Sequence, residues 1–306
     1  MTHIIMLFLD GIGLGDPDPA INPFAAAHTP TLDALAGGQR WLRDTPYTTS
    51  DRAIFIPTDA RFGMDRPRPA SGSGQAALLT GRAIPHEIGE HYGPKPNQAI
   101  RDILDKDNLF ITLRQAGKSA ALITPYPPGW HAAVERGKRL PSSIQYAVRA
   151  AGLPIFTERE YYAGQAVSPD WTGEGWAAFL GFPDAPVYTP AEVGRLLAKL
   201  GKQRDFTLFS TWITDEIGHR GPLERGVEFL ETTDGVLAGL LDAWQDDDGL
   251  IIITSDHGNL EVQGDRRHSL NDVPTVAIGA GREPFAQGLR TIADVTPGIL
   301  RALGLN

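Results

Sequence analysis

The sequence predicts an α/β fold in which a mostly parallel sheet is sandwiched between helices, and three observations support this prediction. Runs of apolar and β-branched residues at 4–9, 206–212 and 251–254 are typical of strands buried on both faces of a parallel sheet. Helical patterns alternate with these runs along the chain, as they do in βα units. The runs also end abruptly at polar residues, which is where functional side chains lie in open α/β sheets.

Local signals place each element in order. Thr29 and Thr189, each followed by a proline, predict the starts of two capped helices, over residues 29–36 and 189–200. Periodic apolar residues predict a long amphipathic helix over residues 224–244. Four further elements are expected: helices over 109–116 and 292–303, and strands over 120–124 and 273–278.

Composition bounds the class of protein. With 306 residues, 42% hydrophobic and 21% charged, the chain is expected to form a single α/β domain over residues 1–306. A net charge of −9 argues against nucleic-acid and anionic-membrane partners. The apolar run at residues 4–9 is too short for a signal peptide or a membrane span, so we expect a cytoplasmic protein. The absence of cysteine excludes disulfides, thiolate metal sites and thiol nucleophiles.

Residues 126–190 differ in composition from the rest of the chain. Prolines punctuate this stretch, and Trp130, Trp171 and Trp176 lie within it. We interpret it as a small insertion within the domain, a lid or substrate-facing subdomain. Its aromatic residues are expected to form the core of the lid first and to contact a ligand second.

Asp10 ends the first expected strand and is followed by a glycine-rich turn. The glycine spacing resembles part of a dinucleotide fingerprint, but Asp10 stands in place of its first glycine. A loop containing Pro17, Pro19 and Pro23 also follows where that fingerprint needs a helix. We therefore interpret Asp10 as a metal ligand; the alternative is a turn-forming aspartate bonded to its own loop.

Two more strands end in similar residues. Asp215 and His219 are four apart, so both can face one ion from the same side of a helical turn. Asp256 and His257 follow the 251–254 strand directly and form a carboxylate–imidazole pair. The alternatives are a surface ion pair for the first set and a helix cap for Asp256.

Ser71 is the candidate nucleophile. The small residues 70–74 open directly into an apolar helix that runs to about residue 81, which places Ser71 at the helix N-terminus. The unpaired amides and the dipole there favour an anion, as a phosphoryl-accepting serine requires. The alternative is an ordinary serine N-cap.

The candidate residues at the strand ends are better explained as one metal-binding group than as separate features. Without a counter-charge, several carboxylates gathered at strand ends would repel one another. The candidate ligands supply enough nitrogen and oxygen atoms for two divalent cations: Asp10, Asp215, His219, Asp256, His257 and His268.

The order of these motifs resembles the alkaline phosphatase superfamily, in particular the metalloenzyme domain of cofactor-independent phosphoglycerate mutase and phosphopentomutase. The resemblance covers most of residues 1–125 and 190–306. It rests on strand-Asp-Gly at Asp10, Ser-x-x-Gly-Gln at Ser71, Asp-x-x-x-His-x-Gly at Asp215, Ser-Asp-His-Gly-Asn around Asp256, and His-Ser-x-Asn-x-Val-Pro at His268.

The resemblance implies a site with two divalent metal ions, Mn²⁺ or Zn²⁺. One ion would be bound by Asp10, Ser71, Asp256 and His257, and the other by Asp215, His219 and His268. Ser71 would accept the phosphoryl group of a small phosphorylated metabolite. Two cations could depress the serine pKa and stabilise the transition-state charge.

Departures from the resemblance favour a phosphomonoester hydrolase. The family mutases commonly carry a histidine where this chain has Gln75, and phosphoglycerate mutase has a much longer inserted domain that shields its intermediate from water. Here residues 126–190 supply few basic groups: Arg136, Lys138, Arg139, Arg149 and Arg159. A phosphoglycerate or phosphosugar mutase is the first alternative. Sulfate esters or phosphodiesters as substrates, and a non-catalytic metal-binding domain, are further alternatives; an unmodified serine argues against a sulfatase.

Four residues near the motifs are candidate substrate contacts: Gln75, Lys95, Arg220 and Arg267. The positive side chains among them could pair with phosphate or carboxylate groups. The alternative for each is a solvated surface charge.

Overall fold

The computed structural model describes residues 3–305, and its framework is a seven-stranded sheet in the order β2-β3-β7-β6-β1-β5-β4. β4, β5, β1 and β6 are parallel neighbours, whereas β7 is antiparallel to both β6 and β3. The strands are β1 (His3–Leu9), β2 (Thr48–Thr49), β3 (Ala53–Thr58), β4 (Ala120–Leu122), β5 (Phe206–Thr211), β6 (Gly249–Thr254) and β7 (Val273–Gly279).

The antiparallel direction of β7 follows from its connection. Parallel neighbours need a crossover, usually a helix, that carries the chain back to the other end of the sheet. Residues 255–272, between β6 and β7, contain no helix, so the chain re-enters the sheet from the end at which it left. This loop therefore stays at the carboxyl end of β6.

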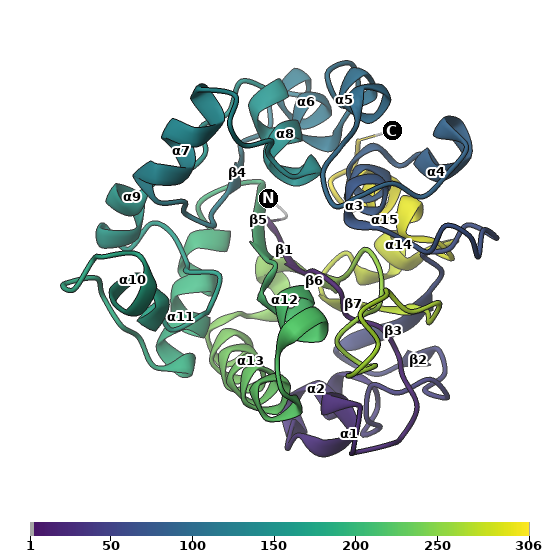
Figure 1. Ribbon diagram of the computed structural model, residues 1–306. Coiled ribbons are helices and arrows are strands. Elements are labelled where there is room, and N and C mark those ends of the chain that lie inside the picture. Colours follow the sequence, from purple (N-terminus) through teal and green to yellow (C-terminus); the bar gives the residue numbers. More distant parts are fainter. Residues whose placement is uncertain (1–2, 306) are drawn as a thin grey trace.

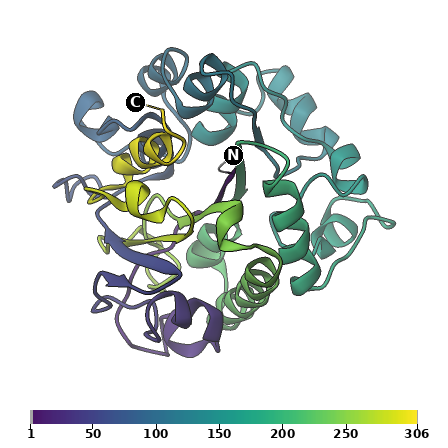
Figure 2. The same cartoon turned by 180° about the vertical axis from the view of Figure 1, so that it is seen from behind.

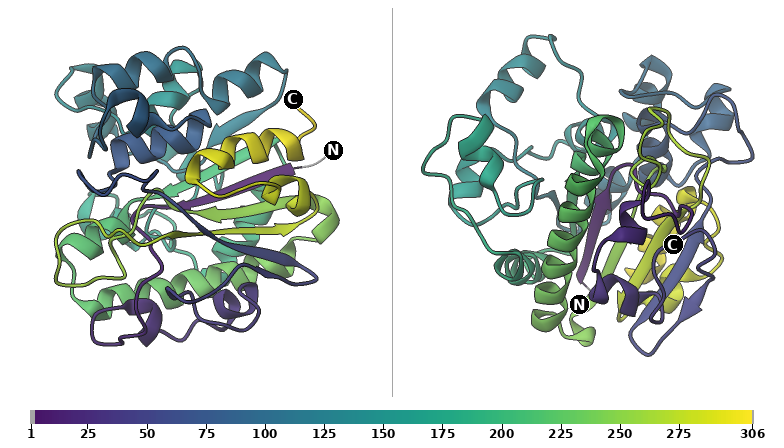
Figure 3. Two further views of the ribbon diagram at one scale, coloured as in Figure 1. Left: turned by 90° about the vertical axis from the view of Figure 1, so that its right-hand side faces the viewer. Right: turned by 60° about the horizontal axis from the view of Figure 1, so that its bottom comes forward.

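The central strands are buried on both faces because apolar side chains alternate between two cores. In β1, Ile5, Leu7 and Leu9 join one core, whereas Ile4, Met6 and Phe8 join the other. Side chains of successive strand residues point to opposite faces, so a strand that is apolar throughout needs cover on both sides. Figure 3 shows the helices above and below the sheet in its left-hand view.

Helices provide this cover, and each can be assigned by the core that its buried residues join. The first core takes α1 (Pro23–Ala26), α2 (Pro30–Leu35), α9 (Glu158–Tyr162), α10 (Glu174–Phe179), α11 (Pro190–Gly201), α12 (Ile213–Arg220) and α13 (Leu223–Ala243). The second core takes α3 (Ser71–Thr80), α4 (Ile84–Ile88), α5 (Gln98–Leu104), α6 (Leu109–Gln115), α7 (Pro128–Glu135), α8 (Ser143–Ala150), α14 (Arg282–Ala286) and α15 (Val295–Ala302). Two short 3₁₀ helices, η1 (Asp246–Asp248) and η2 (Ile292–Asp294), complete the list. Figures 1 and 2 show the two layers from opposite sides.

Residues 126–190 contain α7 to α10, and α7, α9 and α10 lie beyond the edge strand β4 in Figure 1. Their large aromatic side chains are buried against the rest of the chain. Trp171 stacks on Phe209 of β5 with ring centroids 4.2 Å apart, and its Nε1 donates to Thr233 of α13. The stretch thus shares the core of the domain, and its role as a lid stays a prediction.

The expected α/β class is confirmed, including the buried parallel strands at the centre of the sheet. None of the helices in the described residues is long and apolar enough to cross a membrane.

Candidate metal centre

The strand order explains why distant residues meet. β5, β1 and β6 are adjacent and parallel, so their carboxyl ends lie at one edge of the sheet. Asp10 follows β1, Asp215 lies in the first turn of α12 just after β5, and Asp256 and His257 follow β6. The β6–β7 loop adds His268 at the same edge.

The imidazoles of His219 and His268 face each other across a short gap. Their Nε2 atoms are 3.1 Å apart, and these atoms lie 3.5 and 3.6 Å from Oδ1 of Asp215. The Nδ1 atoms lie 3.0 and 2.6 Å from the backbone carbonyl oxygens of Arg266 and Pro69. Because a carbonyl only accepts, each Nδ1 carries the proton, and the two Nε2 lone pairs converge with the carboxylate. These three acceptor atoms would repel one another, and a cation bound between them would remove the repulsion.

A second convergence surrounds His257. Its Nε2 lies 3.0 Å from the Ser71 hydroxyl, 3.4 Å from Oδ1 of Asp10 and 3.7 Å from Oδ2 of Asp256. Both of these carboxylate oxygens are buried without a hydrogen-bond partner in the described residues. A buried carboxylate oxygen without a hydrogen-bond donor costs free energy in the folded state. Two such oxygens close to one imidazole therefore indicate that a cation binds between them.

Asp215 connects the two convergences. One group of mutually close ligand atoms joins Asp215 with His219 and His268, and another joins it with Asp10 and His257. The rings of His257 and His268 are also stacked, with centroids 3.7 Å apart. The structure thus brings all the expected ligands together, and how they are divided between two ions stays a prediction.

Electrostatics agree with this geometry. Burial raises the pKa of Asp10 well above its usual value, and the neighbouring Asp256 and Asp215 raise it further. Burial likewise raises the pKa of Asp256 to about 7, with Asp215 adding to the shift. Burial lowers the pKa of His257, and burial with the charge of His257 lowers that of His268 to about 4. A divalent cation binds neutral imidazoles and deprotonated carboxylates, so it would offset the repulsion between these carboxyl groups.

Two glycines let these loops approach closely. At Gly11, where φ is +73°, a Cβ would lie 2.8 Å from Oδ1 of Asp215. At Gly74 in α3, a Cβ would lie 2.9 Å from the backbone oxygen of Asp256. Any side chain at either position would push apart the segments that carry the ligands.

Further side chains hold the ligands in place. Asn259 donates to Oδ1 of Asp215 over 2.7 Å, and Gln75 donates to Oδ2 of Asp10 over 2.9 Å. The carboxylate of Glu261 is buried and accepts from the amides of Gly13 and Asn259 over 3.1 and 2.8 Å. It also accepts from the side chains of Ser269 and Asn271. Glu261 therefore ties the β1, β6 and His268 loops together.

The donor set fits divalent metal ions. Imidazole nitrogens and carboxylate oxygens without thiolates suit Zn²⁺ and Mn²⁺. Within the described residues, no lysine or arginine forms an ion pair with Asp10, Asp215 or Asp256.

The candidate substrate contacts have different surroundings. Gln75 is buried and bonded to Asp10, so it faces the ligands directly. Lys95 is half-buried, and burial together with the charge of Arg139 lowers its pKa, whereas the charge of Asp10 opposes this shift. Arg220 is exposed at the end of α12. Arg267 is exposed and pairs with Asp265 over 2.8 Å.

Sequence reasoning missed two other residues at the site. Glu261 lies two residues beyond Asn259, but a solvated glutamate would look the same in the sequence. Arg68 donates from Nη1 to the backbone oxygen of His268 over 2.7 Å, a contact between segments 200 residues apart. No local sequence pattern predicts these contacts of Glu261 and Arg68.

Comparison with known proteins gives three results. Residues 189–306 match the model of the Metalloenzyme superfamily, and this range includes Asp215, His219, Asp256, His257 and His268. The 2,3-bisphosphoglycerate-independent phosphoglycerate mutase of Thiobacillus denitrificans is 34% identical over 119 residues, which cover 36% of this chain and 23% of that protein. The PH0037 protein of Pyrococcus horikoshii has a similar structure, with a TM-score of 0.57, 17% identity and coverage of 99% of this chain and 97% of the other.

The family-model match is confined to residues 189–306, which is less than half of the chain. The alkaline phosphatase of the Antarctic bacterium TAB5 has a similar fold, with a TM-score of 0.50 and 12% identity over 99% of this chain and 98% of that protein. The superfamily match agrees with the metal-binding geometry at the sheet edge. The chain spans only about a quarter of the length of the curated mutases that it matches, with 23% covered in the first of them.

Proposed function

We propose that this chain is a member of the alkaline phosphatase superfamily and a metal-dependent phosphoryl-transfer enzyme, which acts on a small phosphorylated metabolite through a phosphoserine at Ser71. The observation that carries the proposal is the position of the Ser71 hydroxyl. It lies 3.0 Å from Nε2 of His257, beside the orphaned oxygens of Asp10 and Asp256. A serine kept only as a helix cap would have no need of these neighbours.

The chain's own groups account for the first half of the reaction. The Ser71 hydroxyl gives up its proton to water and its oxygen attacks phosphorus. The bond to the leaving oxygen breaks, that oxygen takes the bonding electron pair and a proton from water, and the phosphoryl group remains on the serine. Ser71 is the first residue of α3, where the helix dipole stabilises negative charge. In the second half, the oxygen of an acceptor hydroxyl or water attacks the phosphorus and loses its proton to water, the bond between phosphorus and the serine oxygen breaks, and the serine oxygen takes up a proton.

Asp10, Asp215, Asp256 and the three histidines would hold the metal ions, which we propose are Mn²⁺ or Zn²⁺. When bound, such ions lower the pKa of a nearby hydroxyl and stabilise charge on the phosphoryl oxygens.

A second hydroxyl of the substrate is the first candidate for the acceptor, which would make the enzyme a mutase. The support is that the curated relatives are named phosphoglycerate mutases. The family-model match over residues 189–306 adds support, because this range holds Asp215, His219, Asp256, His257 and His268, although Asp10 and Ser71 lie outside it. This ordering reverses the preference for hydrolysis drawn from the sequence alone.

Water is the second candidate, which would make the enzyme a phosphomonoester hydrolase. The basic residues of the 126–190 stretch are all exposed: Arg136, Lys138, Arg139, Arg149 and Arg159. An enzyme that protects its intermediate from water needs an enclosed site, and exposed side chains supply little of that enclosure.

The decisive test is Ser71→Ala in Mn²⁺-loaded protein, screened against phosphomonoesters. Loss of the nucleophile is expected to lower turnover by roughly a thousandfold or more. A quenched reaction of the unchanged protein should give a phosphorylated peptide containing residue 71. Full activity in Ser71→Ala would contradict the proposal.

The matched control is Ser73→Ala, two residues along the same helix. Its hydroxyl accepts from the Tyr92 amide over 3.0 Å and donates to the Ala70 oxygen over 3.2 Å, so its role is structural. This variant is expected to keep most of its turnover. Free phosphate and positional isomers of the substrate are measured together, because the first reports hydrolysis and the second reports a mutase.

A further inference from the structure

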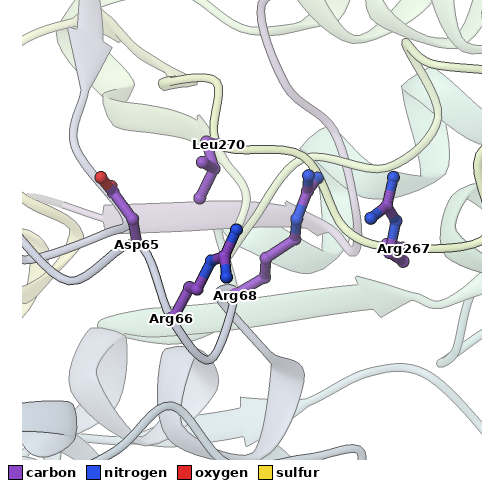
Figure 4. A pocket seen from close by; sticks show the side chains of 5 residues that line it. All are labelled: Asp65, Arg66, Arg68, Arg267 and Leu270. Atoms are coloured by element: carbon purple, nitrogen blue, oxygen red, sulfur yellow. The ribbon is translucent and has the colours of Figure 1, made fainter.

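A cavity of about 660 Å³ lies beside the candidate metal centre, lined by Asp65, Arg66, Arg68, Arg267 and Leu270. Figure 4 shows the three arginine side chains extending in the same general direction from two different segments of the chain. Three guanidinium groups and one carboxylate give the lining a net positive charge, on a protein whose net charge is −9.

The arginines retain capacity to bind an anion. Arg68 uses Nη1 for its bond to the His268 carbonyl. Arg267 uses Nε and Nη2 for Asp265, and 70% of its side chain is exposed. Arg66 forms no ion pair within residues 3–305. Since each guanidinium offers five donors, most of the donors around the cavity are not used by the contacts described here.

The cavity and the metal centre share a wall. The segment that carries Arg66 and Arg68 continues through Pro69 to Ser71, and the segment that carries Arg267 continues directly to His268. The two segments are bonded to each other twice: from Arg68 Nη1 to the His268 oxygen, and from His268 Nδ1 to the Pro69 oxygen. A substrate with its phosphoryl group at Ser71 would therefore have this cavity as a neighbour.

We propose that the cavity binds a second anionic group of the substrate, a carboxylate or a second phosphate. Arginine suits this task because its planar fork pairs with two oxygens of either group. Leu270 offers an apolar contact for the carbon chain between the two anions. The inference rests on the proposed phosphoryl transfer at Ser71 and narrows its substrates to phosphate esters that carry a further negative charge.

Three esters with the same carbon skeleton test the proposal: glycerol 3-phosphate, 3-phosphoglycerate and glycerol 1,3-bisphosphate. The first has a neutral tail, the second a carboxylate and the third a second phosphate. With Mn²⁺-loaded protein, kcat/KM for at least one charged tail should exceed that for the neutral tail by about tenfold or more. The better of the two charged esters identifies the preferred anion.

The variants are Arg66→Gln and Arg267→Gln, singly and together; Arg68 is left unchanged because it holds the His268 loop. Each single change should reduce the preference for the charged tail by about tenfold, the fold-change that one lost charge-assisted hydrogen bond gives. The matched control is Arg195→Gln, an exposed arginine on α11, which should leave the preference as it is.

A binding experiment separates this inference from the proposed function. Metal-loaded Ser71→Ala protein is titrated with 3-phosphoglycerate, glycerol 1,3-bisphosphate and glycerol 3-phosphate in a calorimeter, with and without Arg267→Gln. If the unchanged protein turns over none of the esters but a charged tail still binds the Ser71→Ala protein more tightly through Arg267, the phosphoryl-transfer proposal fails and the anion subsite stands. If the neutral and charged tails bind alike, or if the arginine changes weaken all the esters equally, the subsite is disproved.

Discussion

The two ends of strand β6 both carry aspartates, and the two groups differ in what neutralises them. Before β6, Asp246 pairs with Arg52 over 2.7 Å and Asp248 pairs with Lys202 over 2.6 Å. After β6, Asp256 lies near Asp10 and Asp215, and among the described residues imidazoles are the only basic groups within ion-pair distance of these three carboxylates. Acidic residues in a sequence therefore do not by themselves indicate a metal centre; the second group stands out because three neighbouring carboxylates form no ion pair with a lysine or arginine among the described residues.

The pKa values follow the same division. Burial would raise the pKa of Asp248, but hydrogen bonds from Lys202 and from the Gln245 amide lower it overall. Burial and neighbouring carboxylates raise the pKa of Asp10 and Asp256, and no cationic side chain pairs with either among the described residues. Basic side chains of the protein neutralise the aspartates before β6, whereas the aspartates at its carboxyl end need an added cation.

Glu261 is an instructive third case. It lies at the same edge of the sheet as Asp256 and is equally buried, yet four hydrogen-bond donors satisfy its oxygens. Burial alone therefore does not make a carboxylate a metal ligand. Asp10 and Asp256 differ from Glu261 because each has a buried oxygen without a donor among the described residues.

The largest expected effect comes from Asp256→Asn, which removes the charge and keeps the shape. If the carboxylate binds a metal, turnover should fall by roughly a thousandfold, because metal catalysis contributes several kcal/mol. Metal-free protein should melt at a higher temperature, because a repulsive charge has been removed. Steady-state kinetics and thermal melting measure both effects.

Asp246→Asn is the matched control at the other end of β6. It should leave turnover within about twofold, because it breaks only a half-exposed surface ion pair worth about 1 kcal/mol or less. Equal losses in the two variants would show that the difference between the two ends of the strand has no functional meaning.

An intermediate effect is expected from Glu261→Gln. The amide cannot accept at both ends as the carboxylate does, so the loops that carry the ligands should loosen. Metal affinity and turnover should fall by about 10- to 100-fold, as for other residues that position metal ligands. Metal titration and kinetics at saturating Mn²⁺ distinguish the two losses: recovery of turnover at high Mn²⁺ supports a positioning role, and no change in metal affinity argues against it.

The smallest effect is thermal and depends on pH. Asp256 has a raised pKa in the folded, metal-free protein, so its contribution to stability is fully present below the unfolded value of 3.8. That contribution is lost as the pH rises through about 7. Mn²⁺ competes with these protons, so the stabilisation that it provides should grow between about pH 5 and pH 8.

The measurement is the melting temperature with and without Mn²⁺ at several pH values. At a concentration of about 100 times Kd, Mn²⁺ should add about 2.7 kcal/mol at the higher pH. Asp256→Asn should flatten the pH dependence. An unchanged shift in melting temperature across this pH range would contradict the assignment of these carboxyl groups.

Much of the fold could be predicted because its signals are local. The apolar runs of β1 and β6 have no polar break, so they predict buried strands wherever they occur. Thr189 and Glu192 form a capping box at the start of α11, a pattern that four consecutive residues contain. The short helices α5 and α14 were not predicted; neither begins with the threonine–proline pair that marks the starts of α2 and α11.

The site was predicted only in part for a related reason. Its ligands occur in motifs, and the structure brings them together at the carboxyl edge of the sheet. The direction of β7 and the contacts of Arg68 and Glu261 depend on pairings between distant segments, which neither spacing nor composition encodes. The assignment of each ligand to one of two ions, and the part played by residues 126–190, stay predictions.

The tight fit at Gly11 and Gly74 limits how the proposed enzyme could be adapted to new substrates. Even a methyl group at either position would collide with the ligand-bearing segments, so the centre of the site offers almost no room for innovation. The rim around Arg66 and Arg267 is exposed and under no such constraint. Directed evolution for a different leaving group should therefore collect its beneficial substitutions at the rim and leave the glycine-lined interior untouched.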